Sequence, residues 1–443
     1  MAYTKEDIIR IVREEKIEFI RMQFTDIFGQ MKNVAITASQ VEKAVNNQVM
    51  FDGSSIEGFT RIHESDQCLY PDLNSFVVLP GNVSSGRTAR MFCDVYNTDG
   101  TPFVGDPRGV LRRVLRRAQS MGFDVFNIGP ELEFFLFDMD ENGHATTRTH
   151  DEAGYFDLGP LDHGEATRRE ISHTLEQMGF EIEASHHECA VAQHEIDFKY
   201  NSALDGADKI MTFRLMTKSI ARKNGLHATF MPKPIYDIAG SGMHLNMSLF
   251  KDGKNVFYDP SGERNLSKTA YSFIAGLLDH VQGFTAVTNP LVNSYKRLGA
   301  GHEAPRYRAW SASNRSALIR IPAARGQATR VELRSPDPAC NPYLAVAVCL
   351  AAGLDGIARG LTPPPEITGD IYAMDNATRR ANGIFTLPDT LKDALEEMKK
   401  DALILDVLGQ HVAEHYIKGK MKEWDEYQTR VSSWELEKYL VIY

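Results

Sequence analysis

The stretch GPELEFFLF at residues 129–137 alternates carboxylate and apolar side chains, which predicts a β-strand whose two faces differ in chemistry. A period of two puts Glu131 and Glu133 on one face, about 7 Å apart, and a wall of leucine and phenylalanine on the other. Carboxylates this close in an apolar setting repel each other unless a cation lies between them. A solvent-facing strand edge would give the same pattern, so the pair alone does not establish a metal site.

Three further segments carry polar side chains in a similar arrangement. They offer His244, Asn246 and Ser248 from residues 240–250, Arg330, Glu332 and Arg334 from residues 329–335, and Glu183, Glu188 and Glu195 from residues 183–198. Glu188 and Glu195 are seven residues apart, so on one flat strand they would face opposite ways, and their convergence requires a bend. The polar side chains of any one of these segments could be explained by a structural ion pair or hydrogen bond, without a metal. Together, several carboxylate-bearing strands with one favoured histidine indicate Mg²⁺ or Mn²⁺ and not zinc.

A guanidinium-rich region follows at residues 293–322. It supplies Lys296, Arg297, Arg306, Arg308, Arg315 and Arg320, and Arg330 and Arg334 come shortly after it. Arginine binds carboxylates and phosphates through paired hydrogen bonds, so arginines beside a metal cluster indicate an anionic substrate, a nucleoside triphosphate and phosphoryl transfer. Gly299, Gly301 and Pro305 flank Glu303, which suggests a mobile loop carrying one acid. An exposed glutamate in a turn is the alternative.

Length and composition narrow the class of protein. The chain has 443 residues, with 49 Lys plus Arg against 59 Asp plus Glu, and a formal net charge of −10. A single core stops growing at about 250 to 300 residues, so we expect two domains. Turn-forming residues at 97–109 place the boundary near residue 105, giving domains 1–105 and 106–443. An acidic chain argues against direct binding of nucleic acid or of an anionic membrane.

The spacing of the cysteines and the hydropathy of the chain predict the cellular compartment. The five cysteines form no CxxC pair, and the N-terminus shows no export signal, so we expect a reducing, cytoplasmic environment. The longest apolar stretch, residues 343–354, is shorter than the roughly 20 residues that a transmembrane helix needs. It predicts a buried core helix.

Seven blocks of this sequence resemble the signature motifs of bacterial type I glutamine synthetase. They are MFDGSSIEGF (50–59), GPELEFFLF (129–137), ASHHECAVAQHEIDF (184–198), AGSGMHLNMSLF (239–250), NPLVNSYKRL (289–298), HEAPRYRAWSASNRSALIRIP (302–322) and TRVELRSPDPACNPYLA (329–345). The blocks follow the family's order, and the context of Tyr372 resembles the alpha subclass. The resemblance implies an α+β fold, with an N-terminal β-grasp domain and a larger catalytic domain whose curved, mainly antiparallel sheet is flanked by helices.

The resemblance also implies which residues bind ions and substrates. One ion, Mg²⁺ or Mn²⁺, would be held by Glu133, Glu188 and Glu195, and another by Glu131, His244 and Glu332. Glutamate would be bound by Arg297, Arg334 and the loop at Gly240. The phosphates of ATP, the co-substrate, would be neutralised by Arg315, Arg320 and Arg330. Candidates for the nucleoside are Glu183, Phe198, Tyr200 and Ser248.

The implied reaction is ATP-dependent ligation of ammonia to L-glutamate, giving L-glutamine through γ-glutamyl phosphate, for nitrogen assimilation. Asp52 matches the residue that deprotonates ammonium, and the ammonium pocket would be completed by Ser55, Tyr155 and Glu188. Arg315 would act on the transferring phosphoryl group. Glu303 matches an acid that closes the site, which excludes water from the acyl phosphate.

The family resemblance further implies assembly and regulation. Members of this type form a homo-dodecamer of two stacked six-membered rings, in which Asp52 reaches the site of the adjacent subunit. Arg61 matches a position for feedback inhibition by glutamine, and nitrogen-regulatory transcription factors are implied partners. Ala239 departs from the family's usual asparagine, which puts the affinity for glutamate in doubt.

Three other functions stay open at the level of sequence. A γ-glutamyl-amine ligase would use a polyamine in place of ammonia, although an ammonium pocket with Asp52, Ser55 and Tyr155 favours ammonia. A catalytically silent nitrogen-sensing scaffold would keep the fold, but every expected metal ligand is present. A two-metal phosphohydrolase is the third alternative, and the density of arginines weighs against it.

Overall fold

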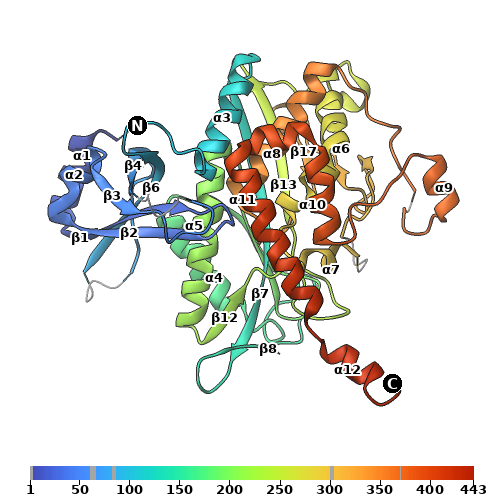
Figure 1. Ribbon diagram of the computed structural model, residues 1–443, viewed down its shortest axis with the longest axis horizontal. Helices are drawn as coiled ribbons and strands as arrows, with labels where there is room; N and C mark the ends of the chain where they lie inside the picture. The colour runs from blue at the N-terminus through green and yellow to red at the C-terminus, as the bar shows by residue number, and fades with distance from the viewer. Residues whose placement is uncertain (1–2, 60–65, 82–85, 300–303, 370) are drawn as a thin grey trace.

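The computed structural model describes residues 3–443 apart from residues 60–65, 82–85, 300–303 and 370. Its N-terminal domain is a mixed sheet covered by short helices (Figure 1). The helices are α1 Lys5–Glu14 and α2 Val41–Val45, and the strands are β1 Ile17–Thr25, β2 Met31–Thr37, β3 Val49–Asp52, β4 Asp66–Pro71, β5 Val77–Val78 and β6 Arg87–Asn97. The strand order is β2-β1-β6-β4-β3, with β5 paired to β6. Parallel pairing of β1 with β6 at its centre gives the predicted β-grasp architecture.

The catalytic domain is built on a second sheet with the order β15-β16-β17-β13-β7-β10-β9. The strands are β7 Val125–Met139, β8 Ala145–Thr149, β9 Ile182–His187, β10 Gln193–Phe198, β11 Asn201–Ser202, β12 Leu226–Thr229, β13 Met243–Lys251, β14 Lys254–Asn255, β15 Trp310–Ser311, β16 Ile319–Arg320 and β17 Val331–Leu333. Within the described residues, β15 and β16 are the one parallel pair of this sheet. The sheet is therefore mainly antiparallel, as predicted.

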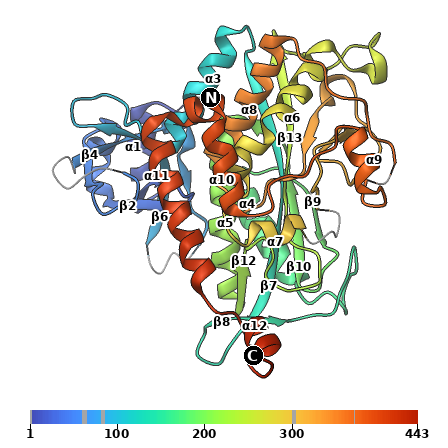
Figure 2. The same ribbon diagram turned by 45° about the vertical axis from the view of Figure 1, so that its right-hand side comes forward.

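The helices of the catalytic domain flank this sheet (Figures 1 and 2). They are α3 Pro107–Ser120, α4 Glu165–Gln177, α5 Ala203–Lys223, α6 Lys268–Thr288, α7 Ser294–Gly299, α8 Pro342–Arg359, α9 Asn376–Ala381, α10 Leu391–Lys400, α11 Ala402–Thr429 and α12 Ser433–Tyr439. Short 3₁₀ turns occur at Ala38–Gln40, Leu73–Ser75, Glu263–Asn265 and Gly326–Ala328. The predicted α+β fold is confirmed.

The alternation seen in the sequence of β7 decides which face of the sheet is apolar. Phe134 packs against Phe213 of α5, with ring centroids 6.1 Å apart, and Phe126 packs against Phe273 of α6 at 6.3 Å. Leu132 is fully buried in the same core. Glu131 and Glu133, at the alternate positions, face away from these helices, so the core fixes the direction in which both carboxylates point.

Helix α8 lies at the centre of the catalytic domain, where the apolar stretch 343–354 predicted a core helix. It is the one helix among the described residues that is long and apolar enough to cross a membrane, yet 78% of its apolar window is buried inside the protein. Helix α6 crosses it closely at Gly276 and Gly356. Burial of this kind is what a core helix requires, so the prediction is confirmed.

The two domains are joined by a buried guanidinium. Arg108 on α3 binds Asp72 and Asp94 of the N-terminal domain, at 2.8 and 2.7 Å, and Asp208 of α5 at 2.8 Å. Its side chain is 3% exposed. Asn341, the N-cap of α8, also donates to the backbone oxygen of Asp26 at 3.0 Å. These contacts hold the N-terminal sheet against the helices that support the catalytic sheet.

Candidate active site

The first group of possible metal ligands forms where β7, β13 and β17 pair. His244 on β13 lies opposite Glu131 on β7, and Asn246 lies opposite Glu332 on β17. The Nδ1 atom of His244 is 3.1 Å from Glu131 Oε2 and 3.8 Å from Glu332 Oε1. One donor atom from each of His244, Glu131 and Glu332 lies within 4.8 Å of the others. Strand register thus gathers three residues that are far apart in the sequence.

Hydrogen bonds keep the Glu131 carboxylate of this group ionised. Burial alone would raise the pKa of Glu131, but His244 and the side-chain amide of Asn246 lower that pKa to about 2. Glu332 is fully buried and pairs with Arg334, whose Nη1 is 2.7 Å from Glu332 Oε1, and with Arg320. The two arginines that were predicted to bind substrate therefore also position a predicted metal ligand.

The second group forms at the β9–β10 hairpin. Glu188 follows the end of β9, the chain reverses, and Glu195 on β10 pairs with His186 of β9 and with Glu133 of β7. This hairpin supplies the bend that the seven-residue spacing of Glu188 and Glu195 requires. Donor atoms of His186, Glu188 and Glu195 lie within 4.8 Å of one another. Glu133 stands beside them, and its Oε2 accepts from Gln193 Nε2 at 2.9 Å and from the Gly242 amide at 3.0 Å.

The electrostatics of the second group favour a cation. Burial, reinforced by the charge of Glu188, raises the pKa of Glu133 to about 7. Burial, together with the charges of Asp197 and Glu133, raises the pKa of Glu195 well above its ordinary value. Carboxylates that resist ionisation because they face one another become favourable ligands once a divalent ion lies among them. The donor set of oxygen atoms with a few histidine nitrogens fits such an ion.

A cavity of about 500 Å³ opens over both groups. Eleven of the residues predicted from sequence line it, namely Glu131, Glu133, Tyr155, Glu188, Glu195, Gly240, His244, Arg297, Arg315, Arg320 and Arg334. Arg297 is buried, and its Nη1 and Nη2 donate to the backbone oxygens of Ser335 and Arg334, at 2.8 and 3.1 Å. Arg297 therefore also fixes the segment that follows β17. A cavity lined by both carboxylates and guanidinium groups suits a charged substrate that meets a cation.

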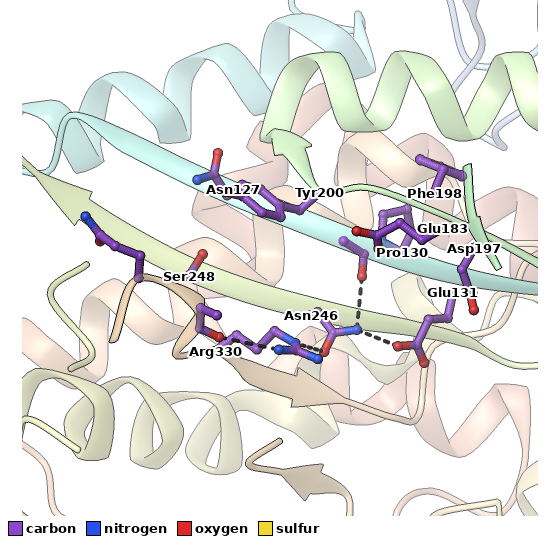
Figure 3. Close-up of a pocket in the computed structure, with 13 residues that line it drawn as sticks. Asn127, Pro130, Glu131, Glu183, Asp197, Phe198, Tyr200, Asn246, Ser248 and Arg330 are labelled. Carbon is purple, nitrogen blue, oxygen red and sulfur yellow. Dashed lines mark hydrogen bonds between the residues drawn. The ribbon is translucent and has the colours of Figure 1, made fainter. Parts of the chain in front are cut away.

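A smaller pocket of about 310 Å³ adjoins this cavity, because Glu131 and Asp197 line both. It contains the five remaining nucleotide candidates, Glu183, Phe198, Tyr200, Ser248 and Arg330. Figure 3 shows Asn246 between Arg330 and Glu131; it accepts from Arg330 Nε at 3.0 Å and donates to Glu131 Oε1 at 2.9 Å. Phe198 lines this pocket and also packs on the rings of Phe180 and Phe213, with centroids 5.0 and 5.9 Å apart.

Two predicted residues, Asp52 and Ser55, lie elsewhere, and two more fall outside the described residues. Asp52 ends β3 in the N-terminal domain, where its Oδ1 accepts from the backbone amide and hydroxyl of Ser54 at 2.8 and 2.6 Å. Neither Asp52 nor Ser55 is among the described residues that line the two cavities. Figure 2 shows the N-terminal sheet at the left of the view and strands β9 and β10 to the right of its centre. Glu303 and Arg61 lie outside the described residues.

Several residues that shape the site were given no role from the sequence. Asn246 was noted on one strand face with His244, and the structure shows that it connects the smaller pocket to the first metal group. Asp197 lies two residues beyond Glu195 on β10, and burial raises its pKa to about 6. Gln193 links Glu133 to the backbone oxygen of Gly240. His186 was overlooked because the doubled histidine before Glu188 gives no periodic signal.

Comparisons with known proteins bear on the whole chain. A family model for the β-grasp domain of glutamine synthetase matches residues 16–98, and a model for the glutamine synthetase catalytic domain matches residues 104–439. A protein named glutamine synthetase from Clostridium saccharobutylicum is 61% identical over 438 residues, which is 99% of both chains. One from Thermus thermophilus is 58% identical over 446 residues and matches both chains over their full length.

A solved structure also resembles this protein over almost its whole length. The structure described as "GmaS/ADP complex-Conformation 1" superposes with a TM-score of 0.89 at 34% sequence identity. The match covers 98% of this chain and 99% of that one. Likeness therefore extends over both domains and includes the strands that carry the candidate site.

Proposed function

The chain belongs to the glutamine synthetase family, and from this premise we propose that the paired cavities are the site at which it makes glutamine. The protein is an enzyme that ligates ammonia to L-glutamate with ATP, and the family uses divalent metal ions. The observation that carries the assignment of the site is that two carboxylate–histidine groups meet several arginines in two adjoining pockets.

The larger cavity suits glutamate and the smaller pocket suits the nucleotide. Arg297, Arg334 and the loop at Gly240 would bind the amino acid, and Arg297 also holds the segment that follows β17. A Cβ atom on Gly240 would lie 2.3 Å from the backbone oxygen of Pro232, so the loop reaches its position only with glycine there. Arg330, fixed by Asn246, lies in the smaller pocket and would meet the phosphates of ATP.

Phosphorylation of glutamate solves the leaving-group problem of the reaction. The γ-carboxylate oxygen forms a bond to the terminal phosphorus of ATP while the bond to ADP breaks, and ammonia then displaces phosphate. Arg315, Arg320 and Arg330 would disperse the charge of the transferring group. Divalent ions held by Glu131, His244 and Glu332, and by Glu133, Glu188 and Glu195, would supply Lewis acidity to the phosphates. We propose Mg²⁺ or Mn²⁺ as these ions, since carboxylate oxygens dominate both ligand sets.

Ammonium reacts only after it loses a proton. We propose that a carboxylate oxygen of Asp52 accepts this proton in the cavity of an adjacent subunit, with Ser55, Tyr155 and Glu188 forming the ammonium pocket. Asp52 does not line the cavities of its own chain, which supports an arrangement of this kind. It fits the homo-dodecamer implied by the signature motifs. We also propose the alpha subclass, regulation at Arg61, closure by Glu303 and binding of nitrogen-regulatory transcription factors on the ground of those motifs, and a cytoplasmic location on the ground of cysteine usage.

A substrate comparison tests the proposed function. The purified enzyme is assayed for the amide product with ammonium or with putrescine, in the presence of glutamate, ATP and Mg²⁺. We expect glutamine from ammonium at a rate at least tenfold above the rate of amide formation from the diamine. A preference for putrescine would identify a γ-glutamyl-amine ligase instead.

A second assay separates the remaining alternatives. We expect ATP turnover to require both glutamate and a divalent ion, because phosphoryl transfer has no acceptor without the amino acid. Phosphate release in the absence of glutamate would indicate a phosphohydrolase, and absence of turnover in the assembled protein would indicate a silent scaffold.

A further inference from the structure

His186 lies inside the second metal group, although the signature motifs assign no role to it. Its side chain is 18% exposed and borders the larger cavity. Its Nδ1 is 3.5 Å from Glu188 Oε1, and its Nε2 is 3.7 Å from Glu195 Oε2. Two donors bound at about 2.1 Å to the same ion lie roughly 3 to 4 Å apart. One donor atom from each of His186, Glu188 and Glu195 lies within 4.8 Å of the others, so the imidazole stands close enough to become a third ligand beside the two carboxylates.

The hydrogen bonds of His186 select the nitrogen that can bind an ion. Nδ1 is 3.2 Å from the backbone oxygen of His187, which can only accept, so Nδ1 carries the proton of the neutral ring. Nε2 then presents its lone pair to Glu195, at a distance beyond a hydrogen bond. A metal-binding histidine typically donates its other ring nitrogen to a backbone carbonyl in this way.

The orientation of the ring is fixed from both sides. His186 pairs with Glu195 in the register of β9 and β10, so the backbone already places the two side chains together. The ring of Phe156 packs edge-on against the imidazole, with centroids 4.8 Å apart and an interplanar angle of 88°. The ring of Tyr155 approaches at 5.8 Å and 79°. These contacts hold Nε2 toward the carboxylates instead of toward solvent.

We propose that His186 Nε2 is a ligand of the ion held by Glu188 and Glu195, and that it raises the preference of this site for Mn²⁺ and Co²⁺ over Mg²⁺. The inference rests on the metal-dependent function proposed above. A nitrogen donor increases affinity for transition-metal ions more than for Mg²⁺, which favours oxygen ligands. Each of the two metal groups would then contain one histidine, His244 in the first and His186 in the second.

Pulsed electron paramagnetic resonance tests this assignment directly. Full-length enzyme and its His186→Gln, His244→Gln and double variants are loaded with Mn²⁺ without nucleotide, and the ¹⁴N couplings of bound Mn²⁺ are recorded. We expect each single variant to keep ¹⁴N coupling from the other histidine, and the double variant to lose it. Loss of all ¹⁴N coupling in His244→Gln, with Mn²⁺ still bound, would overturn the proposal.

Metal titration gives a second measurement. Isothermal titration with Co²⁺ and with Mg²⁺ compares His186→Gln with the wild type, and His173→Gln on the exposed face of α4 is the matched control. We expect His186→Gln to weaken Co²⁺ binding at one class of sites about tenfold or more, while Mg²⁺ binding changes less than threefold. Equal changes for both ions, or none, would contradict a ligand role.

Measurements of glutamine formation distinguish a failure of this inference from a failure of the proposed function. Wild-type enzyme that shows ¹⁴N coupling from His186 but makes no glutamine would contradict the function and leave the ligand assignment intact. Enzyme that makes glutamine, binds Mn²⁺ and shows no contribution from His186 would contradict the inference alone.

Discussion

Glu332 illustrates how single residues of the site serve both structure and chemistry. Its carboxylate is fully buried, belongs to the first metal group and pairs with Arg320 and Arg334. Removing one partner of a buried ion pair is much more costly than removing an exposed one, because the remaining charge cannot be solvated. A neutral replacement therefore affects both the ions and the arginines.

We predict that Glu332→Gln lowers glutamine formation about 100-fold and destabilises the protein by roughly 3 kcal/mol. Glu426→Gln, which removes an exposed partner of Arg430, is the matched control and should change stability by less than about 0.5 kcal/mol. Thermal unfolding and a glutamine assay measure both effects. Equal stability of the two variants would contradict a role for Glu332 in holding the arginines.

The residues that sequence reasoning recovered are those with a periodic or compositional signal. Glu131 and Glu133 alternate on one strand, and the arginines between 297 and 334 cluster visibly. His186 and Asp197 gave no comparable signal, because their significance depends on which strand pairs with which. Cross-strand register is a tertiary property, so the local pattern specified the type of donor but not the complete set of donors.

At the scale of elements, His280 connects three helices. It lies on α6, with Nδ1 2.8 Å from Asp401 at the start of α11 and Nε2 3.1 Å from Asp355 on α8. Burial opposes the charged ring, but the hydrogen bonds and charges of Asp401 and Asp355 prevail and raise the pKa of His280 above its ordinary value. Its stabilising contribution is therefore complete below the unfolded pKa of about 6.5 and is lost as pH rises through the folded pKa.

We predict that His280→Gln lowers the thermal unfolding midpoint more at pH 6 than at pH 9. At the higher pH the wild-type ring has lost the proton that strengthens its bonds to both carboxylates. Unfolding curves at the two pH values, with His173→Gln as the exposed control, measure the difference. A midpoint loss that is the same at both pH values would contradict the raised pKa.

The crossing of α6 and α8 depends on glycine. A Cβ atom on Gly356 would lie 2.1 Å from the backbone oxygen of Ser272, and one on Gly276 would lie 2.1 Å from that of Ala352. Backbone atoms cannot move aside as a flexible side chain can. The close packing of the two central helices therefore requires the absence of a side chain at both positions.

We predict that Gly356→Ala destabilises the enzyme by about 2 kcal/mol, because overpacking outweighs the gain in helix propensity of roughly 1 kcal/mol. Gly299→Ala is the control, since a Cβ atom there would meet no described atom within 4 Å. Denaturant unfolding compares the two variants. A stability of Gly356→Ala equal to or above the wild type would show that the helices can separate without penalty.

Strands and helices were predicted from the sequence where polar and apolar side chains follow a clear pattern. Strand β7 and the core helix α8 appear at the expected positions, whereas the geometry of the hairpin that joins Glu188 to Glu195 was not predictable. That hairpin contains Ala192 at a positive φ of 59°, a conformation that no local pattern announces. Its backbone amide is held by Asp151 at 2.9 Å, so a distant residue stabilises the bend.

At the scale of the whole molecule, the two domains depend on Arg108. Its guanidinium meets three carboxylates, two from the N-terminal domain and one from α5. We predict that Arg108→Met destabilises the enzyme by about 3 to 5 kcal/mol, because Asp72, Asp94 and Asp208 would be left near one another without a counter-charge.

Thermal unfolding measures this prediction. Arg10→Met removes the same charge from an exposed position on α1 and should shift stability by less than about 0.5 kcal/mol. Similar midpoints for the two variants would show that Arg108 does not fasten the domains.

The expected two-domain architecture followed from length and motif order, and the boundary near residue 105 stays a prediction. The relation of Asp52 to the cavities could not be derived from local patterns, since in the proposed arrangement it depends on how copies of the chain pack. Glu131 and His244 could be paired only once β13 was seen beside β7. The types of donor were therefore easier to predict than the pairing of distant segments.

The central claim is that two carboxylate–histidine groups hold the divalent ions used in glutamine synthesis. Anomalous scattering from crystals of the enzyme with Mn²⁺, ADP and a phosphorylated glutamate mimic tests this claim most directly. We predict one Mn²⁺ peak among Glu131, His244 and Glu332, and another at Glu133, Glu188 and Glu195. Mn²⁺ bound elsewhere, with these six side chains free of any ion, would contradict it.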